Sequence, residues 1–378
     1  MLEDHRLAKI EARDSQDRFP RFVGRNAKGN PSKYGARNQL RILTTDQGAV
    51  GWAACGAPEE HTEPLIGERI SGLFQPGIGA LAKGMPLDQP LHDLAGRILQ
   101  KPVYEILGAR GPREVAIYSG AIYFDDMEPE EAPRGIPGVV ESCQQDYDAG
   151  YRAFKLKIGR GFKWFEPEEG LQRDIDVVRA VREAFPDCKV LVDANDAYTC
   201  DGFIRFLNGT ADCDLYWFEE PFPEDEDDLR RLKDHMAKVG CNALIAEGEG
   251  RSEHSTPPTR YGGYTEAHIC KLYDLAEEGL VDAVVIDLNI VGFTRWRHVM
   301  PELEAAGILA APHTWVWCAR PFYTAQLAAG VGNVVCIEGI PGKTSTLDYA
   351  NYPIRDGDVC VPDGPGFDMP LREDSTGE

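Results

Sequence analysis

Several features are missing from this sequence, and each absence excludes a class of protein. No apolar run approaches the length of a transmembrane helix, and the N-terminal residues contain no apolar segment of the signal-peptide kind. The 10 cysteines are scattered without a C-x-x-C pair, which argues against a disulfide framework and against a zinc motif. We therefore expect a cytoplasmic protein that is not embedded in a membrane.

Positive charge is also scarce. The chain of 378 residues has 40 basic and 62 acidic residues, which gives a formal net charge of −22. This negative field disfavours nucleic acid or an anionic membrane surface as the main partner. An anionic substrate would need local cations or a metal ion to offset the field. Hydrophobic residues make up 43% and aromatic residues 9% of the chain, as in a globular protein with a sizeable core.

The length exceeds that of one ordinary domain, and the pattern changes along the chain. Residues 1–112 are expected to form a separate α+β unit. It contains two strands at Asn38–Thr44 and Gly48–Ala53, and a helix over Leu91–Leu107. Residues 345–378 are rich in Gly, Pro and Asp, and we expect them to pack back toward the N-terminal unit.

Residues 113–344 alternate between short apolar runs and helical patterns, which predicts an all-parallel sheet. Eight runs in succession favour closure into a (β/α) barrel of the TIM type. A doubly wound open sheet is the alternative, but no glycine-rich phosphate loop follows any strand. The expected strands are Val115–Ser119, Ala153–Ile158, Val190–Asp193, Leu215–Glu219, Ala243–Ala246, Ala283–Asp287, Ile308–Ala311 and Val334–Ile337.

Three of these strands end in carboxylates. Asp193 closes the third strand and Glu219 the fourth, while the fifth ends in L-I-A-E-G-E-G, which offers both Glu247 and Glu249. Chemistry in a parallel barrel is located where the strands end. Oxygen ligands of this kind suit Mg²⁺, with water or substrate oxygens completing an octahedron. Each acid alone could equally be a surface residue.

The second strand reads F-K-L-K-I-G, with Lys155 and Lys157 two positions apart. Residues i and i+2 of a strand face the same side, so the two ammonium groups repel each other. This repulsion predicts a lowered pKa for one or both, which would suit a general base. The alternative is a pair of lysines that cap an exposed strand end.

Three further polar residues end the last strands. The sixth strand ends in Asp287, the seventh is followed by His313, and the eighth ends in Glu338. A carboxylate such as Asp287 can bind one imidazole nitrogen and orient the ring, which leaves the other nitrogen free as an acid or base. A single histidine after a strand is more often a satisfied polar residue than a catalyst.

The ordered set F-K-L-K, V-D-A-N, F-E-E-P, I-A-E-G-E, a strand-final Asp and A-P-H resembles the mandelate racemase-like branch of the enolase superfamily. The pattern G-R-G-F-K-W, A-E-G-E-G and G-F-T-R-W is similar to an acid-sugar dehydratase group within that branch. The resemblance covers nearly the whole chain. It implies a modified TIM barrel with an α+β capping domain, a homo-oligomer and one Mg²⁺ per subunit. It also implies a small carboxylate substrate, a sugar acid.

The resemblance also implies roles for the proton-transfer residues. Lys157 would be the base on one face of the substrate, with Lys155 tuning its pKa. His313, oriented by Asp287, would act on the opposite face. Glu338 would donate a hydrogen bond to the substrate carboxylate.

By the same resemblance, Asp193, Glu219 and Glu249 would hold the metal, with Glu247 as the alternative third ligand. A loop over residues 21–33 should close over the substrate. The candidate substrate-binding residues are Asn195, Arg21, Arg25, Lys33 and Trp315.

The leading hypothesis is a dehydratase that removes the proton α to a carboxylate through an enediolate, then expels the β-hydroxyl as water. The product would be a 2-keto-3-deoxy acid. The same two bases would also permit a racemase, an epimerase or a lactone cycloisomerase. The third hypothesis is a non-catalytic metal-binding or scaffold protein with a barrel fold. The sequence leaves open which sugar acid is used and its stereochemistry.

Overall fold

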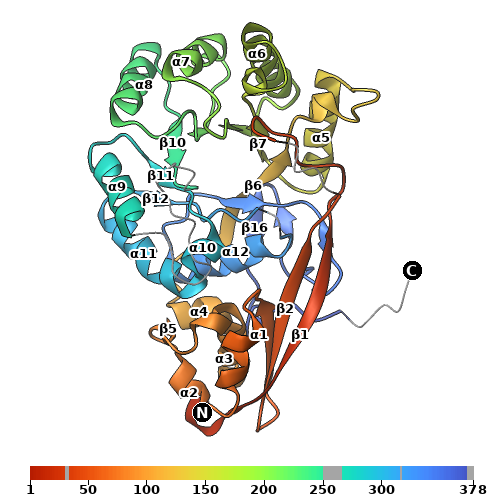
Figure 1. The fold of residues 1–378 in the computed structure, drawn as a ribbon, viewed down its shortest axis with the longest axis vertical. Coiled ribbons are helices and arrows are strands. Elements are labelled where there is room, and N and C mark those ends of the chain that lie inside the picture. The colour runs from red at the N-terminus through yellow and green to blue at the C-terminus, as the bar shows by residue number, and fades with distance from the viewer. Residues whose placement is uncertain (30–33, 250–265, 316, 373–378) are drawn as a thin grey trace.

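The computed structural model describes residues 1–29, 34–249, 266–315 and 317–372. The N-terminal sheet and its helices occupy one end of the molecule, and a ring of helices around a central sheet occupies the other (Figure 1). In the described residues, no helix has the length and apolar character required to span a bilayer.

The N-terminal unit is built on a sheet in the order β14-β1-β2-β3. Its strands are β1 (Leu7–Arg18), β2 (Arg37–Thr45) and β3 (Val50–Ala54), and all of its pairings are antiparallel. Helix α3 (Asp88–Leu99) packs on this sheet so closely that a Cβ on Gly51 would lie 2.4 Å from the Cα of Leu94. Three short elements complete this unit: α1 (Glu59–Thr62), α2 (Ile70–Leu73) and the hairpin β4 (Phe74–Gln75) with β5 (Gly79–Ala80).

The two predicted N-terminal strands are confirmed by β2 and β3. The prediction of one helix over 91–107 is wrong, because α3 ends at Leu99 and a second helix, α4, runs over Val103–Leu107. Gln100 adopts a left-handed conformation with φ of 54°, and Pro102 lacks the N–H that a continuing helix would need. Strand β1 was not predicted.

The barrel strands follow one another in space in the order in which they occur in the chain, and all of their mutual pairings are parallel. At the end of this row, β13 pairs with β6, and a single bridge joins Ala310 of β12 to Val334, three residues before β13. This arrangement is consistent with the predicted barrel. The strands are β6 (Glu114–Ile122), β7 (Ala153–Lys157), β8 (Lys189–Asp193), β9 (Trp217–Glu219), β10 (Leu244–Glu247), β11 (Ala283–Val284), β12 (Leu309–Ala310) and β13 (Ile337–Gly339).

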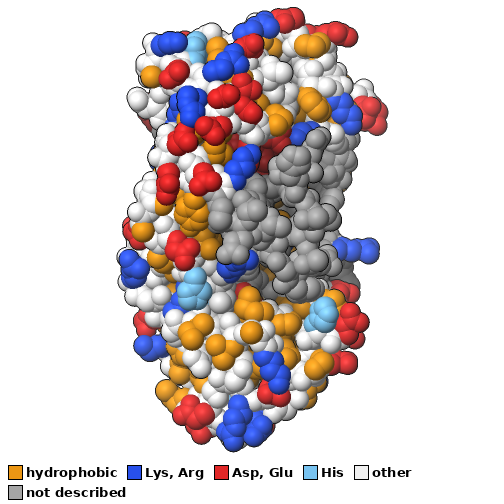
Figure 2. Space-filling model, turned by 60° about the vertical axis from the view of Figure 1, so that its left-hand side comes forward, with side chains coloured by type: hydrophobic (Ala, Val, Ile, Leu, Met, Phe, Trp, Pro, Cys, Tyr) orange, Lys and Arg blue, Asp and Glu red, His pale blue; other side chains and the backbone are white. Residues whose placement is uncertain are grey.

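Helices cover the outside of the ring (Figure 1). Two of them begin at clear N-caps, since Thr199 accepts from Gly202 N before α7 and Asp225 accepts from Asp228 N before α8. Acidic and basic side chains lie next to one another over the upper helices (Figure 2). The helices are α5 (Ile136–Asp148), α6 (Pro167–Ala184), α7 (Cys200–Gly209), α8 (Glu226–Val239), α9 (Glu266–Glu277), α10 (Leu288–Val291), α11 (Phe293–Ala305) and α12 (Arg320–Val331).

Side chains alternate between the two faces of each strand, so the barrel has an inner and an outer core. Tyr118, Leu191 and Trp217 belong to the inner cluster, whereas Phe154 and Leu156 of β7 pack outward in the layer beneath the helices. The inner side chains fill the lower part of the barrel. Polar residues take over only where the strands end, which places the site at that rim.

The chain from Lys343 onward contacts both parts of the molecule. Strand β14 (Lys343–Thr344) pairs with β1, while β16 (Asp358–Cys360) pairs with β6 and with β15 (Ile354–Arg355). Farther along, Phe367 N donates to Asp93 of α3 at 2.7 Å. The segment therefore bridges the N-terminal sheet and the barrel, and the domain boundaries at 112 and 344 stay predictions.

Candidate active site

Lys155 is completely buried inside the barrel and contacts three carboxylates. Its Nζ lies 2.6 Å from Glu219, 3.1 Å from Glu338 and 3.4 Å from Asp193. Burial alone would lower the pKa of Lys155, but the charges of Glu219 and Glu338 outweigh it and raise that pKa well above its ordinary value. The prediction of a lowered pKa is therefore wrong for Lys155, because acids from across the barrel outnumber the neighbouring lysine.

Lys157 lies one step farther along β7, at the rim. Its Nζ donates to Asp193 Oδ2 and, at 3.2 Å, to the side-chain oxygen of Asn195. The ring centroid of Tyr123 lies 5.3 Å from the same nitrogen. Asn195 has a left-handed φ of 48°, and its N–H donates to Asp193 Oδ1 at 2.9 Å. This turn directs the amide of Asn195 toward the ammonium group.

The register of the parallel strands aligns these groups in one row. Lys157 pairs with Asp193, Asp193 with Glu219, and Glu219 with Ala246. Register partners on parallel strands face the same side, and Ala246 belongs to the inner cluster. All four side chains therefore point into the barrel.

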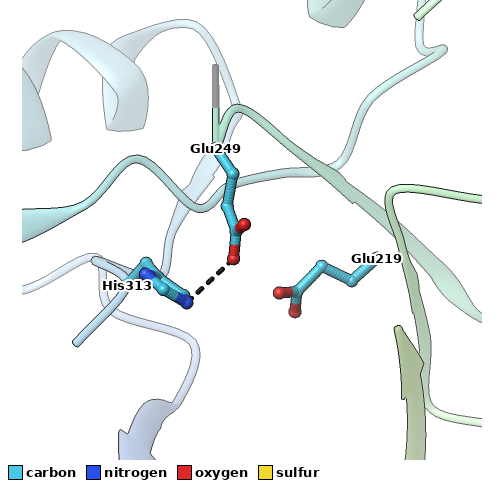
Figure 3. Close-up of side chains that lie close together, drawn as sticks. All are labelled: Glu219, Glu249 and His313. Atoms are coloured by element: carbon cyan, nitrogen blue, oxygen red, sulfur yellow. Dashed lines mark ion pairs between the residues drawn. The ribbon is translucent and has the colours of Figure 1, made fainter. Parts of the chain in front are cut away.

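His313 lies across the barrel from Lys157, after β12. Its Nε2 is 2.8 Å from Glu249 Oε1 and 3.4 Å from Glu338 Oε2, while Nδ1 is 3.4 Å from Asp287 Oδ2. Glu219 points toward the pair of His313 and Glu249 (Figure 3). Burial alone would lower the pKa of His313, but the charges of Glu249 and Glu338 outweigh it and raise that pKa well above its ordinary value.

Asp287 contacts Nδ1 of His313, the ring nitrogen that faces away from Glu249. It caps α10 by accepting from Asn289 N at 2.7 Å, and its other oxygen lies 3.2 Å from Arg320 Nη1. Burial alone would raise the pKa of Asp287, but the charge of Arg320 outweighs it and lowers that pKa. Asp287 is thus kept ionised, and in this state it accepts the hydrogen bond from His313 Nδ1.

Glu338 stands between the lysine and the histidine. One oxygen contacts Lys155, and the other accepts from Thr314 N at 3.0 Å. The carboxylate lies against Gly120, where an added Cβ would come within 2.5 Å of Glu338 Oε1. A glycine at position 120 is therefore part of the site, because any side chain there would displace the carboxylate.

The structure distinguishes the two candidates for the third metal ligand. Glu247 pairs in register with Val284, which packs in the outer core, so its carboxylate lies on the helix side of the sheet. Burial raises the pKa of Glu247 well above its ordinary value, and the charges of Glu224 and Glu220 add to the effect. Glu249 instead reaches His313. This geometry favours Glu249 as the third ligand, and the ligand set stays a prediction.

The residues present fit a hard divalent cation. Ligand atoms of Glu219, Glu249 and His313 lie within 4.8 Å of one another. Glu219 Oε2 is buried and has no hydrogen-bond partner among the described residues, so a cation at this point would satisfy it. Asp193 lies outside this group of three, since its carboxylate contacts Lys157 and Lys155. Carboxylate oxygens are ligands that Mg²⁺ prefers.

Two of the predicted substrate contacts face protein carboxylates. Arg21 is buried and donates to both oxygens of Asp146, at 2.8 and 2.7 Å. Arg25 is buried too, with its Nε 2.8 Å from Glu128 and its Cζ 4.7 Å from the ring centroid of Trp164. These ion pairs bind the loop that begins at residue 21 to the barrel. Direct contact of either arginine with a substrate stays a prediction.

Lys33 and Trp315 are the other two predicted substrate contacts near the N-terminal unit. Lys33 lies outside the described residues. Trp315 stacks on Phe19, with ring centroids 5.8 Å apart, and lies 5.0 Å from the ring of Tyr123. Since Phe19 directly follows β1, these rings form an aromatic wall between the N-terminal unit and the barrel rim.

Sequence reasoning missed residues whose importance depends on distant partners. Arg320 supports Asp287 and donates to the carbonyl of Trp315 at 2.7 Å, and no local pattern predicted the pairing with Asp287. Thr314 donates from both its N–H and its hydroxyl to Glu338. The position of Thr314 directly after the histidine was the one available signal.

A closed parallel barrel with an N-terminal α+β unit and a rim of carboxylates, lysines and a histidine defines a class of acid–base barrel enzymes. A family model described as "Enolase C-terminal domain-like" matches residues 138–251 and 262–375. The chain belongs to this family, the enolase superfamily, which confirms the resemblance read from its motifs.

Solved structures agree over nearly the whole chain. A galacturonate dehydratase from a Geobacillus species, complexed with D-galacturonate and 5-keto-4-deoxy-D-galacturonate, is 30% identical with a TM-score of 0.85. The match covers 98% of this chain and 95% of that one. A mandelate racemase/muconate lactonizing protein from Geobacillus sp. Y412MC10, complexed with magnesium and tartrate, is also 30% identical, with a TM-score of 0.87 and coverage of 98% and 94%.

Curated relatives include an enzyme of another reaction type. The 3,6-anhydro-alpha-L-galactonate cycloisomerase of Streptomyces coelicolor is 29% identical over 322 residues, which cover 84% of this chain and 77% of that protein. Relatives are thus named for both dehydration and cycloisomerisation.

Proposed function

We propose that this protein is a Mg²⁺-dependent dehydratase of a sugar acid. One observation carries the proposal. Lys157 contacts Asp193, His313 contacts Glu249, and Glu219 is near both acids, so the two proton-transfer groups flank the three carboxylates. Two proton-transfer groups that face each other across a substrate can remove one proton and deliver another.

The chain's own residues would divide the reaction between them. Lys157 Nζ, in its neutral form, would accept the proton from the carbon next to the substrate carboxylate. His313 Nε2, in its protonated form, would donate to the β-hydroxyl as the C–O bond breaks and water leaves. The resulting enol would then tautomerise, because its β-carbon takes up a proton as its hydroxyl group loses one, and the product is a 2-keto-3-deoxy acid. Asp287 would hold Nδ1 of His313, which keeps Nε2 directed at the substrate.

The remaining groups would bind and orient the substrate. Asn195 presents its amide beside Lys157, and Glu338, when protonated, would donate to the substrate carboxylate. Asp193, Glu219 and Glu249 would hold the metal. When bound, Mg²⁺ would supply positive charge that stabilises the electron density gathering on the substrate carboxylate as the α-proton leaves.

The test is a substrate panel. Purified protein with Mg²⁺ is incubated with hexuronates, aldonates and aldarates of several configurations, among them D-galacturonate, and 2-keto acids are detected with semicarbazide. A keto acid from one configuration supports dehydration. Silence across the panel, with the protein folded and Mg²⁺ bound, contradicts it.

Racemisation, epimerisation or cycloisomerisation is the second candidate, favoured by the cycloisomerase among the relatives. The same panel in D₂O separates this candidate from dehydration. Exchange of the α-proton for deuterium without keto-acid formation would favour isomerisation. Absence of both exchange and product for every compound would leave the non-catalytic metal-binding barrel as the reading to keep.

A further inference from the structure

A completely buried arginine lies directly beyond the strand that carries the two lysines. Arg160 is 0% exposed, and it forms ion pairs of 2.6 Å with both Asp126 and Asp174. Asp126 lies in the loop after β6, and Asp174 lies on α6. Three elements that follow one another around the barrel thus meet at one guanidinium group.

This group reaches the backbone of the candidate base. Arg160 Nη1 donates to the carbonyl oxygen of Lys157 at 3.2 Å. Asp174 Oδ2 accepts from the backbone N–H of Gly159 at 2.7 Å and of Arg160 at 3.1 Å. The chain that leaves β7 is therefore held at three successive points, and the first of them is the peptide group of Lys157.

Asp174 also ties down the neighbouring loop. The hydroxyl of Tyr198 donates to Asp174 Oδ2 at 2.6 Å. Tyr198 stands three positions after Asn195 in the loop that follows β8. Gly159 fits between these loops, since a Cβ there would lie 2.7 Å from the Cβ of Ala197. One carboxylate thus links the two loops that present Lys157 and Asn195.

The N-terminal segment rests on the same unit. The guanidinium carbon of Arg160 lies 4.1 Å from the ring centroid of Phe124, whose backbone N–H donates to the carbonyl of Arg25 at 3.0 Å. Trp164, in the same loop as Arg160, donates from its indole to the carbonyl of Asn26 at 2.7 Å. The loop that contains Arg25 and Asn26 and the strand end that carries Lys157 therefore both pack against the residues around Arg160.

A contribution to the stability of the fold does not by itself explain why Arg160, Asp126 and Asp174 are buried together. Removing charges from water is costly, and an apolar cluster of similar volume is often at least as stabilising as a buried ion pair. What an arginine with two carboxylates provides is directional bonding, because its planar fork fixes the angle of each partner. The directions fixed here are those of the loops around the candidate base.

We propose that Arg160, Asp126 and Asp174 form a positioning unit. The unit sets where Lys157 Nζ and the amide of Asn195 stand relative to the α-carbon of the substrate. None of its three members needs to touch the substrate. The inference rests on the proposed role of Lys157, and a displacement of about 1 Å at a reacting group can cost roughly 100-fold in rate.

The experiment compares graded variants with a matched control. Arg160→Lys keeps the charge but loses the fork, Asp174→Asn keeps the shape but loses the charge, and Tyr198→Phe removes one hydrogen bond. Arg205→Lys is the control, because Arg205 pairs with Glu168 on the exposed side of α6. For each protein, kcat, KM, the pH profile of kcat, Mg²⁺ affinity and Tm are measured.

We expect kcat to fall by about 10- to 100-fold in Arg160→Lys and Asp174→Asn, and by less than about 10-fold in Tyr198→Phe. KM and Mg²⁺ affinity should change little, and the limb of the pH profile that reports the base should shift. Arg205→Lys should behave as the parent protein. Full kcat with an unmoved profile in folded Arg160→Lys overturns the proposal, and so does a loss that follows Tm alone.

A second readout does not depend on turnover. Competitive labelling with acetic anhydride across a pH series gives the reactivity of Lys157 relative to the exposed Lys9 in the same digest. The positioning unit predicts a changed reactivity of Lys157 in Arg160→Lys and Asp174→Asn but not in Arg205→Lys. Unchanged labelling overturns the inference whatever the reaction is, whereas a panel without turnover or exchange contradicts only the proposed function.

Discussion

Asp193 and Glu219 are register partners in the parallel pair of β8 and β9, so their carboxylates leave neighbouring strands at one level. The same row continues to Lys157, which pairs with Asp193. A one-residue slip in either pairing would turn a carboxylate to the helix side of the sheet. The backbone register thus places an acid–base group next to two of the three proposed metal ligands, whereas the third, Glu249, lies in the loop after β10.

Replacing His313 by asparagine should abolish most of the proposed dehydration. Asparagine keeps a polar group near Asp287 but cannot deliver a proton to the leaving hydroxyl, so kcat should fall by roughly 100-fold or more. Keto-acid formation and Mg²⁺ titration of the same preparation check this. His235→Asn is the control, because His235 is half-buried on α8, on the helix side of the barrel, and its Nε2 lies 2.7 Å from the side-chain oxygen of Asn208. Full turnover in folded His313→Asn would contradict the assigned role.

The third metal ligand can be assigned by two matched substitutions. Glu249→Gln removes a negative oxygen from the group formed with Glu219 and His313, whereas Glu247→Gln alters a carboxyl on the helix side. Mg²⁺ affinity, measured by calorimetry, should fall by roughly 100-fold or more in Glu249→Gln. It should change by only a few-fold in Glu247→Gln. The reverse order would assign Glu247 as the ligand.

Asp125 makes a specific contribution to the pH dependence of stability. Burial raises the pKa of its carboxyl from 3.8 to about 6, although Arg21 lies nearby and opposes the rise. The folded protein holds this proton more tightly than the unfolded chain, so the stability that it provides is present below about pH 4. This stability is lost as the pH rises through about 6.

The Asp125→Asn variant should therefore lose less stability than the parent protein between about pH 5 and about pH 8. The expected difference is about 1 kcal/mol in the free energy of unfolding. Urea unfolding at the two pH values measures it, with Glu131→Gln, an exposed acid a few residues away, as the control. Parallel pH dependence in the parent and Asp125→Asn would show that Asp125 has an ordinary pKa in the folded protein.

The barrel and the polar residues at its rim were predictable because buried parallel strands leave a strong signal. Apolar runs such as those of β8 and β9 are covered on both faces, and the carboxylate that ends each run is therefore conspicuous. Strand β1 gave no such signal, since it reads L-A-K-I-E-A-R-D-S-Q-D-R and most of its side chains are exposed. Its partners, β2 and β14, lie about 20 and about 330 residues away in the chain.

The ion pairs of the site could not be predicted from the sequence, because their partners are also distant in the chain. The spacing of Lys155 and Lys157 revealed their mutual repulsion but not the carboxylates of Glu219 and Glu338, which approach from other strands. Arg21 was a candidate for substrate binding because it lies in the loop expected to close over the substrate, and its partner Asp146, 125 positions away, leaves no local signal. Local patterns show which charges exist, whereas only the fold shows which of them meet.

The contact between Gly120 and Glu338 yields the last prediction. Gly120→Ala would place a methyl group 2.5 Å from Glu338 Oε1 and 2.7 Å from its Cγ, so the carboxylate must move away from Lys155 and Thr314. We expect a loss of about 1–3 kcal/mol in the free energy of unfolding, together with a lower kcat.

Gly72→Ala is the matched control for this substitution, because an added Cβ at Gly72 meets nothing within 4 Å and the residue lies in helix α2. Alanine there should be neutral or stabilising by about 0.4–1 kcal/mol, since it restricts the unfolded chain. Urea unfolding and the turnover assay on both variants measure the contrast. If Gly120→Ala matched Gly72→Ala in both stability and kcat, Glu338 would have room to shift, and its carboxylate could not be a fixed part of the site.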